Sequence, residues 1–524
     1  MKLRTIVKIA ITSSVVLLCS GFALYSFFRL SAAEGQKDFN LYELVPSTTS
    51  AVFVTDDVLE FVAEVDELTC SKNQQYLYVS KLFSYLKQSL YALSEDTPHG
   101  LSRQMNQMLI SFHEPDNERN QVLYCRLGNG DKELVNRFVR KYISSLYPPK
   151  TFIYKGEEII IYPMADGDFL ACYLTSDFMA LSFQKKLIEN VIDAYKSGKS
   201  LADDSTFTGI RAPKKSAAAA TIYTRMQGMM GWTEFDMKMK DDFIYFSGIT
   251  HDADTCFAFI NQLRQQQSVK GFPGEVLPST AFYFSRQGIT DWVSLLSYGN
   301  AQGQSVPART SEVQNRDKEF SRYLMENAGQ DLVACLFQRE DTLQGAAAVL
   351  SLSVADVTEA ERMLRALVNA APADEGRRNP RITFCYTVNK AYPIYRLPQT
   401  TLFEQLTSFA EPTLDVYAAF YGGRLLLAPD ADALAHYIRQ LDKGEVLNGA
   451  MVYQTGMDHL SDSYHFMLMA DFDHIFQQSE NHVRFVPDFF LRNADFFRHF
   501  TLFVQFACAD GVVYPNIVLK YKSE

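Results

Sequence analysis

Hydrophobic and polar positions follow two periods along residues 40–524. Short apolar runs such as Met108–Phe112, and alternating ones such as His465–Ala470, predict strands. Elsewhere apolar residues recur at helical spacing, as at Leu187, Val191 and Ile192, and predict amphipathic helices. From this pattern we expect an α+β fold in which helices cover mixed, mostly antiparallel sheets.

The pattern of elements occurs twice. Val45-Pro46-Ser47-Thr48 opens the first series, and Leu277-Pro278-Ser279-Thr280 opens the second. Further on, Thr151-Phe152-Ile153-Tyr154 matches Thr383-Phe384-Cys385-Tyr386 at the same interval. The ordered matches predict two repeated sheet-plus-helix domains.

Helices are predicted at corresponding places in the two series. One runs through Leu187 and ends near Gly198, and the other runs through Leu434 and ends near Gly444. A glycine just past the last apolar position is a common helix stop, because it accepts a left-handed backbone.

Residues 9–28 form an uncharged run of 20 residues, long enough to cross a bilayer as a helix. Lys2, Arg4 and Lys8 precede it, so the positive-inside rule places the N-terminus in the cytoplasm. A cleaved signal peptide ending near Ala33 and a lipoprotein modified at Cys19 are the alternatives. We favour the anchor, because the apolar run exceeds the usual length of a signal-peptide core.

The expected organisation therefore has six parts. These are a cytoplasmic N-terminus (1–8), a transmembrane anchor (9–28), a juxtamembrane linker (29–44), a first α+β repeat (45–264), a linker (265–276) and a second α+β repeat (277–524).

The order of elements and the Pro-Ser-Thr openings resemble the uncharacterised single-anchor exported proteins of Bacteroidota, a family with a domain of unknown function. The resemblance covers most of residues 40–524. It implies an exported location and an internally duplicated α+β fold, and it brings no established activity.

Composition excludes some classes of partner. The formal net charge is −11, which argues against nucleic acid, because phosphate backbones are bound by clustered lysine and arginine. The eight cysteines contain no C-x-x-C pair, and no metal-ligand spacing occurs. We therefore predict no cofactor and no metal.

Motifs that could carry chemistry have simpler explanations. Gly198-Lys199-Ser200 follows a helix and lacks the first glycine of a phosphate-binding loop. Gly128-Asn129-Gly130 is followed by Asp131 and Glu133, which would repel phosphate. We interpret the first as a helix end and the second as a turn.

One segment near the C-terminus combines aromatic residues with arginine, a composition enriched in protein interfaces. We favour packing into the chain's own core, and contact with a partner or a membrane surface is the alternative. The residues of that partner surface would be Phe485, Phe489, Phe490, Arg492, Phe496 and Phe497.

These observations predict a non-enzymatic binding or scaffold protein of the cell envelope. It would be anchored in the inner membrane through residues 9–28, with its bulk in the periplasm and an envelope protein as its partner. Two alternatives remain: an enzyme with its site in the groove between the repeats, and a lipid or small-ligand binding module.

Overall fold

The structure is a computed structural model that describes residues 39–73 and 105–522. Within that range it leaves out residues 115–116, 118, 129–130, 139–146, 165–166, 211–217, 226–230, 252–257, 294, 296–310, 340–345, 371–380, 389, 399, 402, 404–405, 408–414 and 479–485. The predicted anchor at residues 9–28 lies outside the described residues. Among the helices that are described, none is long and apolar enough to cross a membrane.

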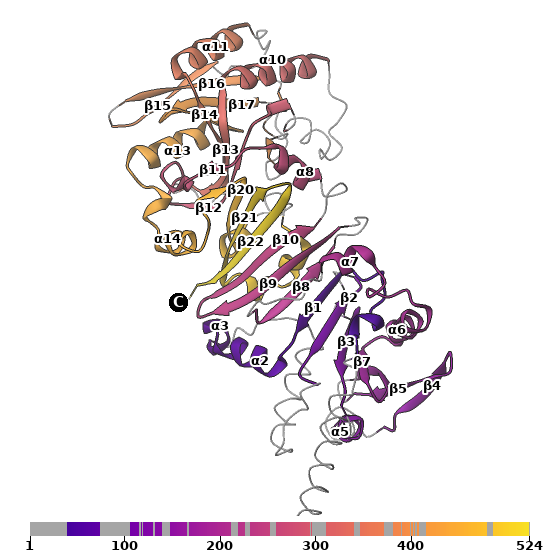
Figure 1. The fold of residues 1–524 in the computed structure, drawn as a ribbon. Helices are drawn as coiled ribbons and strands as arrows, with labels where there is room; N and C mark the ends of the chain where they lie inside the picture. The colour runs from indigo at the N-terminus through magenta and orange to yellow at the C-terminus, as the bar shows by residue number, and fades with distance from the viewer. Residues whose placement is uncertain are drawn as a thin grey trace, which may run out of the picture.

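One antiparallel sheet of twenty strands dominates the molecule, which confirms the predicted α+β class (Figure 1). In the first half its strands are β1 (Ala51–Thr55), β2 (Met108–Phe112), β3 (Gln121–Arg126), β4 (Lys150–Tyr154), β5 (Glu157–Pro163), β6 (Phe169–Leu174), β7 (Phe178–Ser182), β8 (Ala220–Thr224), β9 (Trp232–Lys240) and β10 (Phe243–His251). In the second half they are β12 (Ala281–Gly288), β13 (Ala328–Gln338), β14 (Ala346–Val354), β15 (Ile382–Tyr386), β16 (Ala391–Pro398), β17 (Asp415–Tyr421), β18 (Arg424–Ala428), β20 (Phe466–Asp471), β21 (Phe500–Ala509) and β22 (Val512–Tyr521).

The same strand order occurs in both halves. From the outer edge inward, the first half runs β4-β5-β6-β7-β3-β2-β1-β8-β9-β10. The second half runs β15-β16-β17-β18-β14-β13-β12-β20-β21-β22. The halves meet where β10 pairs with β22, so β4 and β15 are the two outer edges of one continuous sheet.

The junction has pseudo-two-fold symmetry. Asp241 and Asp510 are the left-handed residues of the hairpins that lead into β10 and β22. Ser247 lies six residues after the first, Asn516 lies six residues after the second, and these two residues face each other across the junction. Because equivalent positions pair antiparallel, the axis runs perpendicular to the sheet through this pair.

Strand register corrects one of the sequence matches. Pairing leads from Leu123 outward to Thr151 in the first half, and from Leu350 outward to Ile382 in the second. Thr151 therefore corresponds to Ile382 and not to Thr383. The letter match was one residue out of register, and a slip of one residue exchanges the faces of a strand.

Helices cover both faces of the sheet. One face, called the α6/α13 face, is covered by α6 (Lys185–Ser197), α7 (Ser205–Ile210), α13 (Ala431–Asp442) and α14 (Met451–Met457). The other, called the α5/α11 face, is covered by α2 (Val58–Glu67), α3 (Thr69–Lys72), α5 (Asp131–Phe138), α10 (Ser311–Asn327), α11 (Val357–Ala370), α15 (Phe472–Phe476) and α18 (Ala494–Phe497). The remaining described helices are α8 (Ala258–Gln265), α17 (Asp488–Arg492), η1 (Leu41–Leu44), η3 (Pro273–Glu275) and η4 (Leu447–Gly449).

The hydrophobic core differs between the two faces. On the α5/α11 face one cluster of buried side chains extends across both halves. On the α6/α13 face the core consists of two clusters, one in each half. The junction is therefore packed on one face and separates two cores on the other.

Local chemistry explains several element boundaries. The Asp57 carboxylate accepts from the Glu60 amide at 2.9 Å and caps α2, and Asp430 does the same for α13 through Ala433 at 2.7 Å. α6 ends at Gly198, whose φ of 63° lies in the left-handed region, as predicted from its sequence.

The stretch between the halves contributes to the second one. Within the predicted linker, β11 (Val269–Lys270) pairs with β19 (Ser463–Tyr464) in a small separate sheet. Pro273 and Gly274 are buried in the 3-10 helix that follows. Residues 265–276 are therefore packed against the chain rather than extended between two bodies.

Candidate binding edges of the sheet

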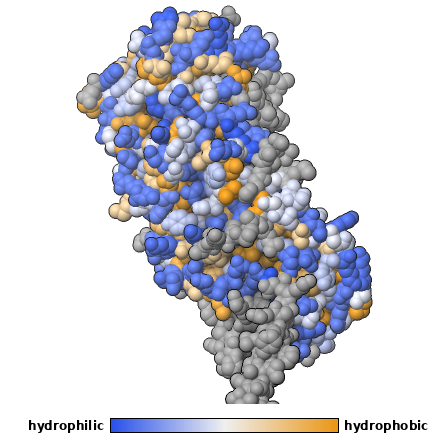
Figure 2. Space-filling view, viewed as in Figure 1, coloured by the Kyte–Doolittle hydropathy of each residue, from blue (hydrophilic) through white to orange (hydrophobic). Residues whose placement is uncertain are grey.

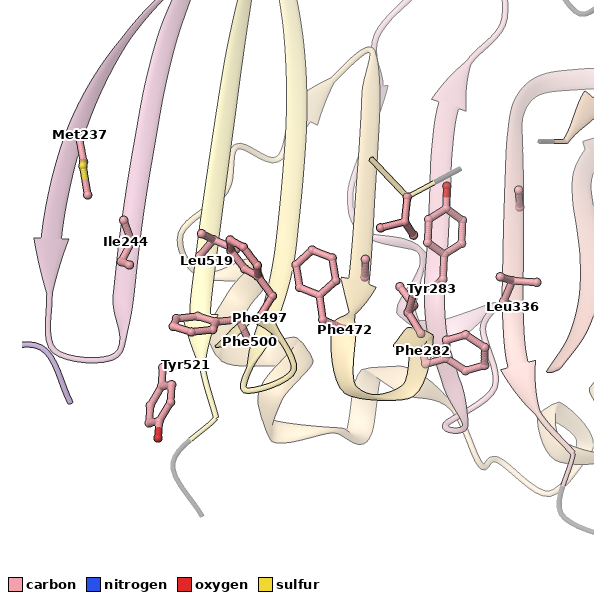
Figure 3. Packing of buried hydrophobic residues seen from close by; sticks show 14 of the residues in the cluster. Met237, Ile244, Phe282, Tyr283, Leu336, Phe472, Phe497, Phe500, Leu519 and Tyr521 are labelled. Atoms are coloured by element: carbon pink, nitrogen blue, oxygen red, sulfur yellow. The ribbon is translucent and has the colours of Figure 1, made fainter. Parts of the chain in front are cut away.

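Most of the predicted aromatic partner surface packs inward. Phe497 is buried, and Phe490 and Phe496 pack against the core cluster of the α5/α11 face. The Phe490 ring lies 4.9 Å from Phe472 and 4.8 Å from Phe497, centroid to centroid. Figure 3 shows Phe472, Phe497 and Phe500 beside Leu519 on one side of the central strands.

The rest of that segment stays open to solvent. Phe489 and Arg492 are exposed, whereas Phe485 lies outside the described residues. A partner surface here stays a prediction. Its described exposed part is narrower than the sequence suggested, because the other aromatic residues contribute to the core.

The outer edge strand β15 exposes a row of large apolar side chains. Ile382, Phe384 and Tyr386 alternate along it with exposed fractions of 37%, 54% and 69%, and Val388 follows at 95%. The Phe384 and Tyr386 rings lie 6.3 Å apart on the α5/α11 face. Cys385 points to the opposite face and is buried against α13, where its thiol donates to the Ala435 carbonyl oxygen at 3.6 Å.

The strand is held at the edge by one neighbour. Among the described strands, β15 pairs with β16 alone, so half of its backbone N–H and C=O groups point away from the described sheet. Both edges lie at the ends of an elongated molecule (Figure 1). In Figure 2 the visible surface is mostly hydrophilic, with hydrophobic residues scattered among polar ones, which makes an ordered apolar row notable by contrast.

The other outer strand, β4, exposes one large apolar side chain on the α5/α11 face. Ile153, the register equivalent of Phe384, is 71% exposed on the same face. Lys150 begins the strand and Lys155 follows it. On the opposite face the Lys185 ammonium lies 4.9 Å from the centroid of the Phe152 ring. Lysines at an edge strand are a usual protection against unwanted pairing.

The junction between the halves has a smaller exposed area. On the α6/α13 face Tyr245 and Tyr514 occupy equivalent positions either side of the pseudo-two-fold axis. Tyr245 is partly covered, because its hydroxyl lies 3.3 Å from His459 Nδ1 beyond α14. Tyr514 and the neighbouring Ile249 are exposed.

A cluster of mostly buried charged side chains lies in the second half. Arg286 Nε donates to the Asp331 carboxylate at 3.0 Å, and Arg424 Nη1 donates to it at 3.3 Å. Arg424 Nε also donates to Ser351 Oγ at 2.6 Å. Burial would raise the pKa of Asp331, but Arg424, Ser353 and Arg286 together lower it below its usual value.

These bonds tie strands β12, β13, β14 and β18 together. In the first half the register equivalents of the Ser351 and Arg424 positions are Tyr124 and Phe178, so the ionic cluster belongs to the second half alone. We assign it a structural role, because its polar groups hydrogen-bond to one another and to nearby backbone.

A serine–histidine pair in the first half is also structural. Ser111 Oγ lies 2.9 Å from His113 Nε2 and 3.1 Å from the Tyr124 hydroxyl. Ser111 and Tyr124 are fully buried, and a serine nucleophile has to reach its substrate. Burial lowers the pKa of His113 to about 4, so the ring is neutral at pH 7.

The cysteines and acids do not gather into a metal site within the described part of the chain. There, no three His, Cys, Asp or Glu side chains come together in a way that could hold an ion. The described cysteines are free, and burial raises the pKa of Cys125 and of Cys172 to about 12.

The edge residues were visible in the sequence but were not singled out. Phe384 and Tyr386 were quoted as part of a repeat match, and their alternation suits any half-buried strand. Residues 382–388 lack the charge, proline and glycine that edge strands usually contain, so the composition of this stretch gave no signal that it forms an edge.

Comparison of the chain with protein-family models, with curated proteins and with solved structures found no match. The resemblance to exported proteins of Bacteroidota therefore stays a prediction.

Proposed function

We propose that the protein is a membrane-anchored binding or scaffold protein of the cell envelope, without catalytic activity, that binds extended segments of its partners at the outer edges of its sheet. The observation that carries this proposal is the exposed apolar row on β15, repeated in part on β4. An unpaired strand offers backbone hydrogen bonds to an incoming strand, and alternate side chains provide specificity.

The arrangement of the halves suits a scaffold. We interpret them as two copies of one duplicated unit, joined at β10 and β22. This places the two edge sites at opposite ends of one sheet. A protein with two separate sites can hold two partners, or two copies of one partner, at a fixed spacing.

The location rests on the N-terminal sequence. The uncharged run at residues 9–28, preceded by three basic residues, supports a single anchor with the sheet in the periplasm. A reporter that is active only outside the cytoplasm, fused after Glu524, should work. An inactive reporter, paired with a cytoplasmic reporter that works in the same place, would overturn this orientation.

The enzyme and the lipid-binding module remain the alternatives. The enzyme would use the junction, where Tyr514 and Ile249 are exposed between the two cores of the α6/α13 face. The lipid-binding module would use the exposed part of the Phe-rich segment around Phe489. The edge sites are preferred because they combine exposed apolar side chains with unpaired backbone, and the junction strands are paired on both sides.

Site-specific photo-crosslinking in intact cells tests the proposal. A benzophenone amino acid would replace Phe384 or Ile153 in the tagged full-length chain, and Met325 on α10 would be the control because it is 44% exposed away from both edges. We expect an adduct of defined mass with another envelope protein from at least one edge and not from Met325. Equal labelling from all three positions, or no protein adduct from either edge, would contradict the proposal.

A further inference from the structure

We propose that β15 is the site where two copies of this chain pair, antiparallel, about a two-fold axis through Phe384. The two twenty-stranded sheets would then form one sheet. This inference deepens the proposed function and rests on it, because it names the partner of one of the two edges.

The composition of the strand favours pairing with itself. Residues 382–388, Ile-Thr-Phe-Cys-Tyr-Thr-Val, contain no charge, no proline and no glycine. They combine β-branched and aromatic residues, which have the highest strand propensity. Segments of this composition on an open edge pair readily with other strands.

The side chains are self-complementary in an antiparallel pair. With Phe384 opposite Phe384 of the second copy, Ile382 faces Tyr386 and Thr383 faces Cys385. The large apolar side chains then share the α5/α11 face, where they are exposed in a single chain. Aromatic and β-branched cross-strand pairs are stabilising, and this register places no like charges opposite each other.

The chain already contains a junction of this kind. β10 and β22 are equivalent strands of the two halves, and they pair antiparallel about the axis through Ser247 and Asn516. Pairing of β15 with β15 would repeat the same symmetry at the outer edge, with the axis again perpendicular to the sheet. Such a two-fold contact closes on itself and gives a dimer instead of a fibre.

The position of the N-terminal segment is compatible with this dimer. Phe39, where the described chain begins, packs on the α6/α13 face, 4.8 Å from the Phe178 ring and 5.9 Å from the Tyr195 ring. An axis perpendicular to the sheet keeps this face on the same side in both copies. Phe39 therefore lies on the same side of the joined sheet in both copies, which suits the proposed anchoring of both chains in one membrane, and such confinement raises the effective concentration of the partner edge.

The β4 edge is less suited to pairing with itself. A proline and a basic residue precede both strands, Pro149-Lys150 before Thr151 and Pro380-Arg381 before Ile382, so these positions do not distinguish the two edges. The difference is Lys155, which stands in the register position of Tyr386, and a lysine there is typical of a protected edge. The two β4 edges would lie at the far ends of the dimer, free for a different partner.

Disulfide trapping tests the pairing. The full-length protein would be purified in detergent as wild type, Phe384→Cys and Ile153→Cys. Antiparallel neighbours have Cα atoms about 4.5–5.5 Å apart, within the range that a disulfide spans. We expect mild oxidation to link Phe384→Cys into a dimer, while wild type and Ile153→Cys, the equivalent position on β4, stay single chains under denaturing conditions.

The mass in solution provides the second measurement. Light scattering should show two copies for wild type and one copy for Phe384→Lys, whose circular dichroism should match wild type because this side chain is already exposed. Two results would overturn the pairing. One is a wild-type protein with the mass of a single copy. The other is a dimer that Phe384→Lys leaves intact and that Phe384→Cys does not link by a disulfide. If the pairing of β15 fails but the edges still cross-link to another protein in cells, the proposed function stands. If the disulfide-linked dimer forms but no other protein cross-links to either edge, the pairing stands and the binding of another envelope protein is rejected.

Discussion

The junction between the two halves predicts a specific change in stability. Ile244 in β10 is 1% exposed and lies opposite Leu519 in β22. Both belong to the core of the α5/α11 face with Phe497 and Phe500, as Figure 3 shows. Ile244→Ala should lower the free energy of unfolding by about 2–5 kcal/mol, because it leaves a cavity at the seam, and Ile244→Val should cost only about 0.5–1.5 kcal/mol.

The two tryptophans allow each half to be followed separately. Trp232 is buried in β9 of the first half, and Trp292 is buried in the second half. In the single-tryptophan variants Trp232→Phe and Trp292→Phe, fluorescence during urea unfolding reports one half at a time. If the sheet is continuous, Ile244→Ala should move both transitions to lower urea.

A shift confined to the Trp232 signal would refute this reasoning, since it would mean that the halves unfold independently. A double-mutant cycle gives the matching control. Ile244→Ala and Leu519→Ala should show a coupling energy of about 0.5–3 kcal/mol, as contacting residues do, and additive effects would contradict the contact.

Other predictions concern single features of the fold. Asp331→Ala should destabilise the protein by about 3–5 kcal/mol in urea unfolding, because it leaves the mostly buried guanidinium groups of Arg286 and Arg424 without their carboxylate partner; an effect below 1 kcal/mol would argue against the ionic cluster. The pKa of His113 falls from 6.5 to about 4 on folding, so the unfolded chain binds the proton first, and stability should decline by about 3 kcal/mol as the pH falls from about 6.5 to 4. His113→Asn should remove that part of the pH dependence, and an unchanged slope would contradict the assignment. Gly456→Ala should lower the melting temperature, because the new methyl group would meet the Phe503 ring at 2.2 Å, whereas Gly209→Ala in the corresponding helix α7 meets open space and should be neutral or stabilising.

Periodic patterns were enough to predict many elements. The helix through Leu187 and its stop at Gly198 follow from local spacing and from the backbone freedom of glycine. The strand at Met108–Phe112 was likewise predicted from its own residues. These features depend on neighbours in the sequence, so one chain is enough to find them.

The position of a strand within the sheet could not be predicted in this way. Alternation at Phe384 and Tyr386 looks the same in a central strand and in an edge strand, because only the tertiary pairing decides what covers each face. For the aromatic segment around Phe497, composition favoured core packing and left a partner surface as the alternative. In the structure Phe490, Phe496 and Phe497 lie in or against the core of the α5/α11 face.

The pairing of the two halves also could not be predicted from the hydrophobic pattern. Two repeats were predicted as separate domains with a linker, and nothing in the local sequence of β10 or β22 indicates that these strands pair with each other. Their pairing is a contact between residues more than 260 positions apart, and it joins the predicted repeats into a single sheet.

Hydrogen–deuterium exchange at β15 tests the central claim most directly. The measurement compares the protein in native membrane vesicles with the same protein purified and diluted in detergent, and follows peptides covering β15, β4 and, as an internal control, the paired strand β21. If the edges accept strands from partners, amides of β15 or β4 should be protected in the vesicles and should lose that protection once dilution in detergent separates the paired chains, while β21 stays protected in both. Equally fast exchange of both edge strands in the two samples would contradict the account.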